Sequence, residues 1–120
     1  MVQAAAEKPL VTITGISGYI GSHTTLLFLQ DGGYRVRGTV RDKNNEAKIA
    51  PLRQAFGEDL FNQMELVEAD LDNDESLVNA VSGSTYVVHI ATALTGVTGG
   101  EDEWIRPAVN GTMSVVKACK

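Results

Sequence analysis

The chain has 120 residues and a formal net charge of −5 at pH 7; 43% of the residues are hydrophobic and 21% are charged. These proportions are those of one folded globular domain and exclude a disordered or fibrous chain. The acidic balance argues against nonspecific binding to nucleic acid or to an anionic membrane, because both require clustered lysine and arginine.

The first nine residues lack the basic region and apolar core of a secretory signal. No apolar run in the sequence approaches the ~20 residues that span a bilayer. The single cysteine, Cys119, allows neither an internal disulfide nor a cysteine metal cluster, as expected in a reducing compartment. The sequence therefore predicts a cytoplasmic chain without membrane contact, nucleic-acid partner or metal site.

The first two predicted strands enclose a glycine-rich turn and a helix. Residues 10–14, LVTIT, form an unbroken run that is typical of a strand buried on both faces. Glycines follow at 15, 18 and 21, and the apolar spacing over 19–31 predicts a helix that stops at the glycine pair 32–33. The alternation over 34–40 predicts the second strand.

The rest of the chain continues this order of elements. We expect a helix in the later part of 41–56 with Pro51 in or near its first turn, strands at 64–70 and 85–93, and helices at 73–81 and 104–120. Parallel strands need crossovers, so the order implies an α/β fold: a Rossmann-type doubly wound parallel sheet of about four strands and four helices, left incomplete. The loop 92–103 is either a ligand loop or a plain surface loop.

The glycine turn between the first strand and the first helix has the chemistry of a phosphate site. Gly15 permits a tight bend, Gly18 lets the backbone approach a pyrophosphate, and Gly21 lets helix and strand pack closely. The helix N-terminus supplies N–H donors and a partial positive charge, so an acidic chain can hold the phosphates locally. Although the spacing is G-x-x-G-x-x-G, its strand–turn–helix context predicts dinucleotide binding.

The end of the second predicted strand bears on the choice between NADP and NAD. Arg41 offers a bidentate fork to a 2′-phosphate, and Lys48 adds a second positive charge. These residues favour NADP(H). Two alternatives stay open: Arg41 as a solvated strand-end charge, and Asp42 as a cap of the next helix. An Asp42 that faces the ribose would favour NAD(H) instead.

Five stretches carry a family resemblance: TGISGYIGS, YRVRGTVRD, VEADLDNDESL, VVHIAT and WIRPAVNGT. In this order the chain resembles the extended short-chain dehydrogenase/reductases of the NAD-dependent epimerase/dehydratase group, and most of all the dihydroflavonol reductase and cinnamoyl-CoA reductase branch. The resemblance covers nearly the whole chain. It implies an oxidoreductase that transfers hydride between NADPH and a carbonyl or alcohol carbon.

The resemblance also implies a place for each cofactor contact. The residues that it places at the pyrophosphate are Gly15, Ser17, Gly18, Tyr19, Ile20 and Gly21. The residues that it places at the 2′-phosphate and the adenine are Arg41, Lys48, Asp70 and Leu71. The residues that it places beneath the ribose and nicotinamide are Ile90, Ala91 and Thr92. A strand-end cap is the alternative role for Asp70, and we interpret His23 and His89 as packed histidines.

The catalytic pair that the resemblance implies, a tyrosine with a lysine four residues later, does not occur in these 120 residues. The three tyrosines are followed four places on by His23, Gly38 and Ile90. We therefore expect residues 1–120 to be the amino-terminal, dinucleotide-binding portion of a longer reductase, inactive without its substrate domain. The alternatives are a non-catalytic dinucleotide module or redox sensor, and a sugar-nucleotide epimerase or dehydratase. A homodimer through an uncovered sheet or helix face is a further hypothesis.

Overall fold

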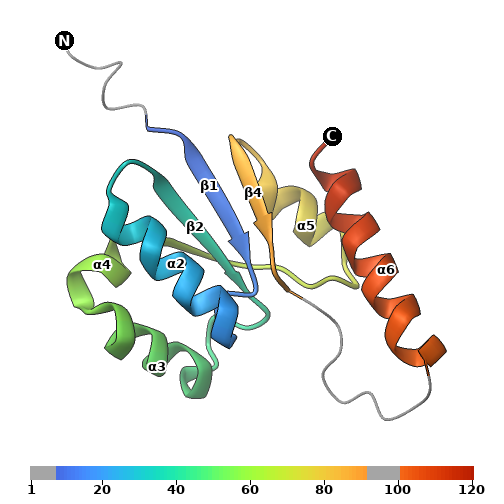
Figure 1. Ribbon diagram of the computed structural model, residues 1–120, viewed down its shortest axis with the longest axis horizontal. Coiled ribbons are helices and arrows are strands. Elements are labelled where there is room, and N and C mark those ends of the chain that lie inside the picture. Colours follow the sequence, from blue (N-terminus) through green and yellow to red (C-terminus); the bar gives the residue numbers. More distant parts are fainter. Residues whose placement is uncertain (1–7, 92–100) are drawn as a thin grey trace.

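Four parallel strands form one sheet in the order β3-β2-β1-β4 (Figure 1). The computed structural model describes residues 8–91 and 101–120. The strands are β1 (Leu10–Thr14), β2 (Arg35–Val40), β3 (Glu65–Glu68) and β4 (Tyr86–His89). The direction of the strand order reverses beside β1, because β2 and β3 lie on one side of it and β4 lies on the other. This arrangement confirms the predicted Rossmann-type α/β fold.

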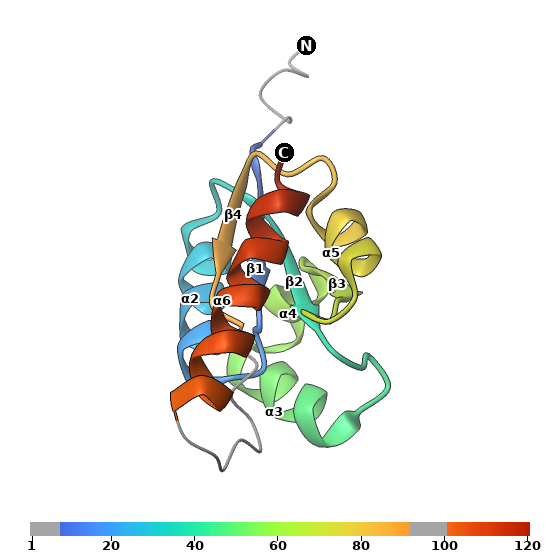
Figure 2. The ribbon, with the colours of Figure 1, turned by 90° about the vertical axis from the view of Figure 1, so that its right-hand side faces the viewer.

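Helices cover both faces of the sheet, and Figure 2 shows α2 and α5 on opposite sides of the strands. The helices are α2 (Tyr19–Asp31), α3 (Glu46–Phe56), α4 (Glu58–Asn62), α5 (Asp74–Val81) and α6 (Glu101–Ala118). One apolar core lies under α2, α3 and α4, and a smaller one lies under α5 and α6. All five residues of β1 are buried, which explains its unbroken apolar and β-branched sequence.

The segment after β2 differs from the expectation in two ways. Pro51 lies in the second turn of α3, not in or near its first turn, so that prediction is wrong. The helix already begins at Glu46, directly after a turn in which Asp42 Oδ1 accepts from Asn44 N at 2.9 Å. Proline lacks the N–H that would bond the preceding turn, and the burial of Ile49 against the core stabilises the helix in spite of this loss. Gly57, with φ +84°, then separates α3 from a short extra helix, α4.

The third and fourth strands are shorter than predicted. β3 ends at Glu68, after which Asp70 turns away to bond the start of α5. β4 ends at His89, because the next two backbone N–H groups bond a threonine side chain instead of a neighbouring strand. The last helix begins at Glu101, so 101–103 of the expected loop are helical; the remainder of that loop, 92–100, lies outside the described residues.

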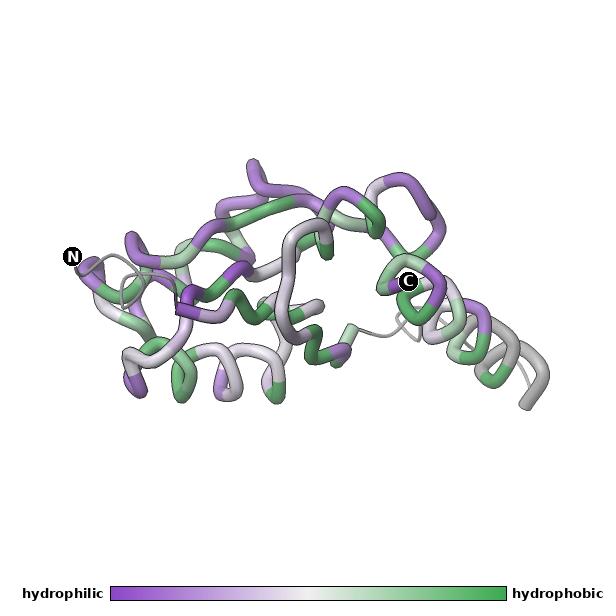
Figure 3. The backbone as a smooth tube through the Cα atoms, turned by 90° about the horizontal axis from the view of Figure 1, so that it is seen from above, coloured by the Kyte–Doolittle hydropathy of each residue, from purple (hydrophilic) through white to green (hydrophobic). Residues whose placement is uncertain are grey.

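The outer surface of α6 carries apolar side chains that the sheet does not cover. Figure 3 shows green apolar positions recurring along this helix. The half-exposed residues among them are Ile105, Val109, Met113 and Val116, while Val115 packs into the smaller core. Of the helices that the structure describes, none has the length and hydropathy needed to cross a bilayer.

Candidate functional site

A groove of about 650 Å³ opens at the carboxyl ends of the four strands. Its walls come from the β1–α2 turn, the end of β2, the start of α3, and the segments that follow β3 and β4. The strand order reverses at this same edge, beside β1. In open α/β sheets such a reversal leaves a crevice between diverging loops, and this crevice is the usual place for a ligand.

The groove brings together the residues that the sequence assigned to a cofactor, except one. Thr92 lies outside the described residues. The residues of the assignment that line the groove are Gly15, Ser17, Gly18, Tyr19, Ile20, Gly21, Arg41, Lys48, Asp70, Leu71, Ile90 and Ala91. Lining residues that the assignment did not contain are Thr14, Thr39, Val40, Asp42, Asn45, Ala69, Asp72 and Leu77.

The three glycines of the turn lie in different surroundings. Gly15 has φ +71°, and a Cβ placed on it would lie 2.8 Å from Cα of Ala91. A Cβ on Gly21 would overlap the carbonyl oxygen of Gly15. Gly18 has φ −86°, and the nearest atom to a Cβ placed on it is the Gly15 oxygen at 3.8 Å. Gly15 and Gly21 are therefore required by packing, whereas a side chain at Gly18 would stand in open space beside the groove.

The N-terminus of α2 faces the groove with its backbone donors uncovered. Its N-cap is Gly18, which has no side chain to bond the first turn, and the first turn contains no acidic residue. The regular ladder starts with Ser22 N, which donates to Gly18 O at 2.9 Å. The backbone N–H groups of the first turn, which precede Ser22 in the chain, and the positive end of the helix dipole favour the binding of an anion at this point.

Two threonines attach the turn and its surroundings to the sheet. Thr39 of β2 accepts a hydrogen bond from Gly15 N through Oγ1 and another from Ile16 N through its carbonyl oxygen, both at 3.2 Å. Thr14 of β1 accepts from Ile90 N at 2.9 Å and from Ala91 N at 3.0 Å, both through Oγ1. Sequence reasoning did not identify these two threonines as site residues. The feature that could have indicated them is a polar side chain in a strand that is buried on both faces, because such a group must find hydrogen-bond partners.

The Thr14 hydroxyl also lies 2.8 Å from Nδ1 of His89. Because this oxygen already accepts two backbone N–H groups, its own hydrogen is the one that joins it to the ring, and Nδ1 is the acceptor. The ring is then neutral, with its hydrogen on Nε2. Burial lowers the pKa of His89, which also favours the neutral form. These contacts give His89 a packing role.

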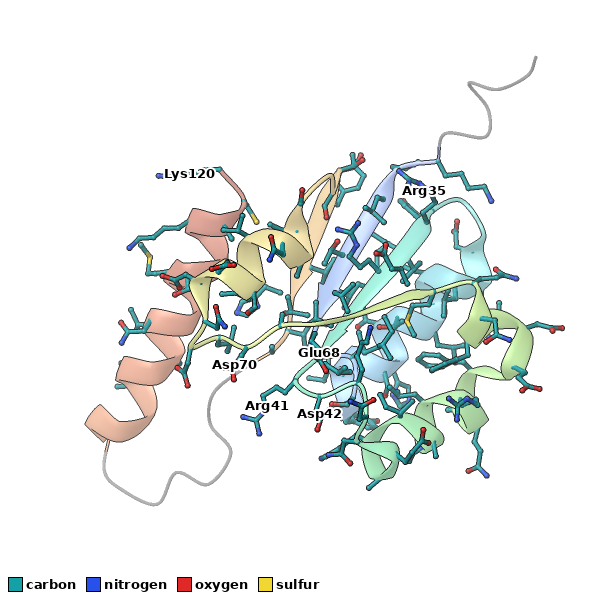
Figure 4. The ribbon with its side chains drawn as sticks, turned by 180° about the vertical axis from the view of Figure 1, so that it is seen from behind. Arg35, Arg41, Asp42, Glu68, Asp70 and Lys120 are labelled. Atoms are coloured by element: carbon teal, nitrogen blue, oxygen red, sulfur yellow. The ribbon has the colours of Figure 1, made fainter. Side chains whose placement is uncertain are left out.

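Arg41 and Asp42 lie beside each other where β2 ends, and Arg35 lies at the opposite end of that strand (Figure 4). In the described ranges, ion pairs involve Arg37 and Arg53 but neither Arg41 nor Lys48. Asp42 instead uses Oδ1 to accept from Asn44 N in a turn ahead of α3; the N-cap of that helix is Asn45, so Asp42 does not take the role of a cap of the next helix. Among the residues that the structure describes, neither cation at the groove is held by an ion pair, which suits an anionic ligand.

The segment after β3 is held by local contacts. Asp70 N donates to Ser76 Oγ at 3.0 Å, and Asp70 Oδ1 accepts from Asp72 N at 2.9 Å. Asp70 thus caps the strand end while it lines the groove. Leu71 packs against α6, where a Cβ on Gly111 would lie 3.0 Å from Leu71 Cδ1.

The sequence model of the NAD dependent epimerase/dehydratase family matches residues 11–120. The chain belongs to this family. Among its curated epimerase/dehydratase relatives, dihydroflavonol 4-reductase of Zea mays is 39% identical over 117 residues, which cover 97% of this chain and 32% of the relative. Tetraketide alpha-pyrone reductase 1 of Arabidopsis thaliana is 39% identical over 114 residues, covering 94% and 34% respectively. The chain spans about a third of the length of the curated relatives it matches.

Solved structures share the fold of this epimerase/dehydratase chain. The crystal structure of vestitone reductase from alfalfa (Medicago sativa L.) matches with a TM-score of 0.69 and 26% identity, over 93% of this chain and 32% of that one. Yeast methylglyoxal/isovaleraldehyde reductase Gre2, complexed with NADPH, matches with a TM-score of 0.67 and 23% identity, over 91% and 32%. The relatives confirm the resemblance that the sequence motifs indicated.

Proposed function

We propose that the groove binds NADP(H), and that the chain is the dinucleotide-binding part of an oxidoreductase acting between NADPH and a carbonyl or alcohol carbon. The observation that carries the proposal is the placement of two cations, Arg41 and Lys48, which form no ion pair among the described residues, in the same groove as the uncovered N-terminus of α2. Arg41 and Lys48 supply positive charge locally in a chain with a net charge of −5, and NADPH carries phosphates at two places, the pyrophosphate and the 2′-phosphate.

Each part of the dinucleotide would lie against a different part of the groove. The pyrophosphate would lie over Gly18, where backbone N–H groups donate and no side chain intervenes. The adenine would lie between the β2 and β3 ends, beside Leu71. The ribose and nicotinamide would run along Ile90 and Ala91, which Thr14 holds in place. When bound, the nicotinamide supplies the hydride.

The surroundings of Asp42 support NADP(H) over NAD(H). One of its carboxylate oxygens is occupied by the Asn44 N–H, which holds the residue in a turn at the start of α3. Arg41 forms no ion pair with another described residue, and it offers a planar fork of donors to a 2′-phosphate. The same fold carries NADPH in the yeast Gre2 complex.

Hydride transfer to a carbonyl also needs a proton donor, and none of the tyrosines in this chain is followed four residues later by lysine. Since the chain spans about a third of its curated relatives, we assign the reaction to a longer protein that contains this segment. The residues present here hold and orient the cofactor.

Calorimetric titration with NADPH and with NADH tests the proposal. We expect tighter binding of NADPH, and a loss of ~10- to 100-fold in NADPH affinity in Arg41→Ala, with little change for NADH. Arg35→Ala is the matched control, because this exposed arginine lies at the other end of β2. Equal affinity for the two dinucleotides, or an Arg41→Ala variant that keeps the NADPH preference, would contradict the cofactor assignment.

A further inference from the structure

One residue of β2 bonds two successive residues of the glycine turn. Thr39 receives the Gly15 N–H on its hydroxyl oxygen and the Ile16 N–H on its carbonyl oxygen, each at 3.2 Å. Thr39 is 3% exposed, so water has little access to its acceptor oxygens. Thr39 nevertheless lines the groove. The turn is therefore attached to the second strand by a buried side chain at the edge of the ligand site.

The neighbouring residue of β2 makes this attachment possible. A Cβ on Gly38 would lie 2.6 Å from Ile16 Cδ1 and 3.1 Å from the sulfur of Met64. Ile16 is fully buried in the space that the missing side chain leaves. The turn consequently rests against β2, which places the Gly15 N–H within reach of the Thr39 hydroxyl.

The position of Gly15 controls the position of the anion donors. The Gly15 carbonyl oxygen accepts from Gly18 N at 3.4 Å and lies directly against Gly21, so a displacement of Gly15 moves the first turn of α2 with it. On the other side, Ala91 stands against Gly15 and blocks movement toward β4. Thr39 supplies the hydrogen bond that prevents movement away from β2.

We propose that Thr39 is a positioning residue of the dinucleotide site, whose hydroxyl holds Gly15 and thereby the pyrophosphate donors of α2 in the binding geometry. This inference rests on the proposed binding of a dinucleotide in the groove. It makes a prediction different from that for Arg41. The pyrophosphate is common to NADPH and NADH, so loss of the hydroxyl weakens both, whereas loss of Arg41 weakens NADPH alone.

Three threonine variants separate positioning from packing. Thr39→Val keeps the shape of the side chain but leaves the partly buried Gly15 N–H without its acceptor. Thr39→Ser keeps the hydroxyl and loses only a methyl group. Thr12→Val is the matched control, because Thr12 is a buried threonine of β1 whose hydroxyl bonds Ser84 Oγ and which does not line the groove.

The affinities of the folded variants for NADPH and NADH test the inference. In Thr39→Val we expect both affinities to fall by about tenfold with their ratio unchanged, and in Thr39→Ser we expect values within about threefold of the original chain. Thr12→Val should lose thermal stability but keep both affinities. The inference is overturned if Thr39→Val binds as well as the original chain, or if Thr39→Ser binds as weakly as Thr39→Val.

Hydrogen exchange in the unaltered chain gives a second measurement that does not depend on how Thr39→Val folds. The Gly15 amide should exchange as slowly as the Ile16 amide, because both donate to Thr39. A Gly15 amide that exchanges as fast as an open loop overturns the inference. If the unaltered chain binds neither dinucleotide, the proposed function fails and the inference fails with it. Binding of both with an unaffected Thr39→Val contradicts the inference alone.

Discussion

The Thr14 hydroxyl donates a hydrogen bond to Nδ1 of His89, its register partner in the parallel β1–β4 pair, at 2.8 Å. A protonated ring would place a hydrogen on Nδ1 and point it at an oxygen that already accepts two backbone N–H groups. The contact therefore selects the neutral imidazole, in agreement with the lowered pKa that burial causes.

We predict that this contact makes folding sensitive to mild acid. The pKa of His89 is lower in the folded chain than its ordinary value of about 6.5, so the unfolded chain binds the proton more readily. The contribution to stability is fully present above about pH 6.5 and is lost as the pH falls from there toward the folded pKa. Thermal melting at a series of pH values, compared with His89→Asn, which keeps an acceptor near Nδ1 but does not titrate, measures it.

His23→Asn serves as the control for that experiment, because His23 lies on the exposed side of α2 and donates to the carbonyl oxygen of Tyr19 in its own helix. It should keep the acid-dependent loss of stability that His89→Asn diminishes. Identical pH profiles for His89→Asn and the unaltered chain would show that His89 is not responsible.

Substitutions at Gly18 and Gly21 should have opposite consequences. Gly21→Ala forces a methyl group against the Gly15 carbonyl, and we expect a loss of about 1–3 kcal/mol or more in the free energy of unfolding. Gly18→Ala meets no close neighbour, so the expected loss of stability is limited to about 0.5–1 kcal/mol, the preference for glycine over alanine at an N-cap. It should nevertheless weaken NADPH binding by at least ~10-fold, because the methyl group stands where the pyrophosphate approaches. Urea denaturation and titration separate the two effects.

Arg37 joins the sheet to the end of α5. Its Nε donates to Glu65 Oε1 at 3.0 Å, and Nη1 donates to the carbonyl oxygens of Ala80 and Ser82, each at 2.7 Å. We predict that Arg37→Lys costs about 1.5–3 kcal/mol of unfolding free energy, because an ammonium group cannot reproduce this fork of donors. Arg35→Ala on the same strand should change stability by less than about 0.5 kcal/mol. Urea denaturation of both variants provides the comparison.

Gly38 and Ile16 should behave as a coupled pair. Gly38→Ala alone pushes a methyl group toward Ile16 Cδ1 and should destabilise the chain by about 1–3 kcal/mol. Ile16→Val removes that carbon and costs about 0.5–1.5 kcal/mol by itself. In the double variant the two losses should be clearly less than additive, as a double-mutant cycle can measure. Simple additivity would mean that the two side chains do not compete for the same space.

The first half of the site could be predicted because its determinants are local. The buried strand 10–14, the three-glycine spacing and the helix after it are each recognisable in one short segment, and Arg41 follows from the end of the next strand. The roles of Thr14 and Thr39 could not be predicted in the same way. Each depends on which strands flank β1, and their partners lie far away along the chain.

The predictions that were wrong concern positions where a tertiary contact outweighs the local sequence pattern. Pro51 is tolerated in the second turn of α3 because the buried Ile49, Leu52 and Phe56 stabilise the helix through tertiary packing, which outweighs one missing N–H. The strand 85–93 was predicted too long because its apolar sequence continues after the ladder ends. There a threonine hydroxyl replaces the neighbouring strand as the partner of the backbone.

The loop that carries Arg41 is anchored separately from the glycine turn. Glu68 at the end of β3 accepts the Lys43 N–H at 2.9 Å, and Asp42 closes the turn that leads into α3. Both contacts use backbone N–H groups of the loop and involve no atom of the Arg41 side chain. A replacement at position 41 therefore alters the charge offered to the ligand without disturbing the loop backbone. Under the proposed function, we expect a substitution at position 41 to change the preference between the two nicotinamide cofactors while the fold of the loop is kept.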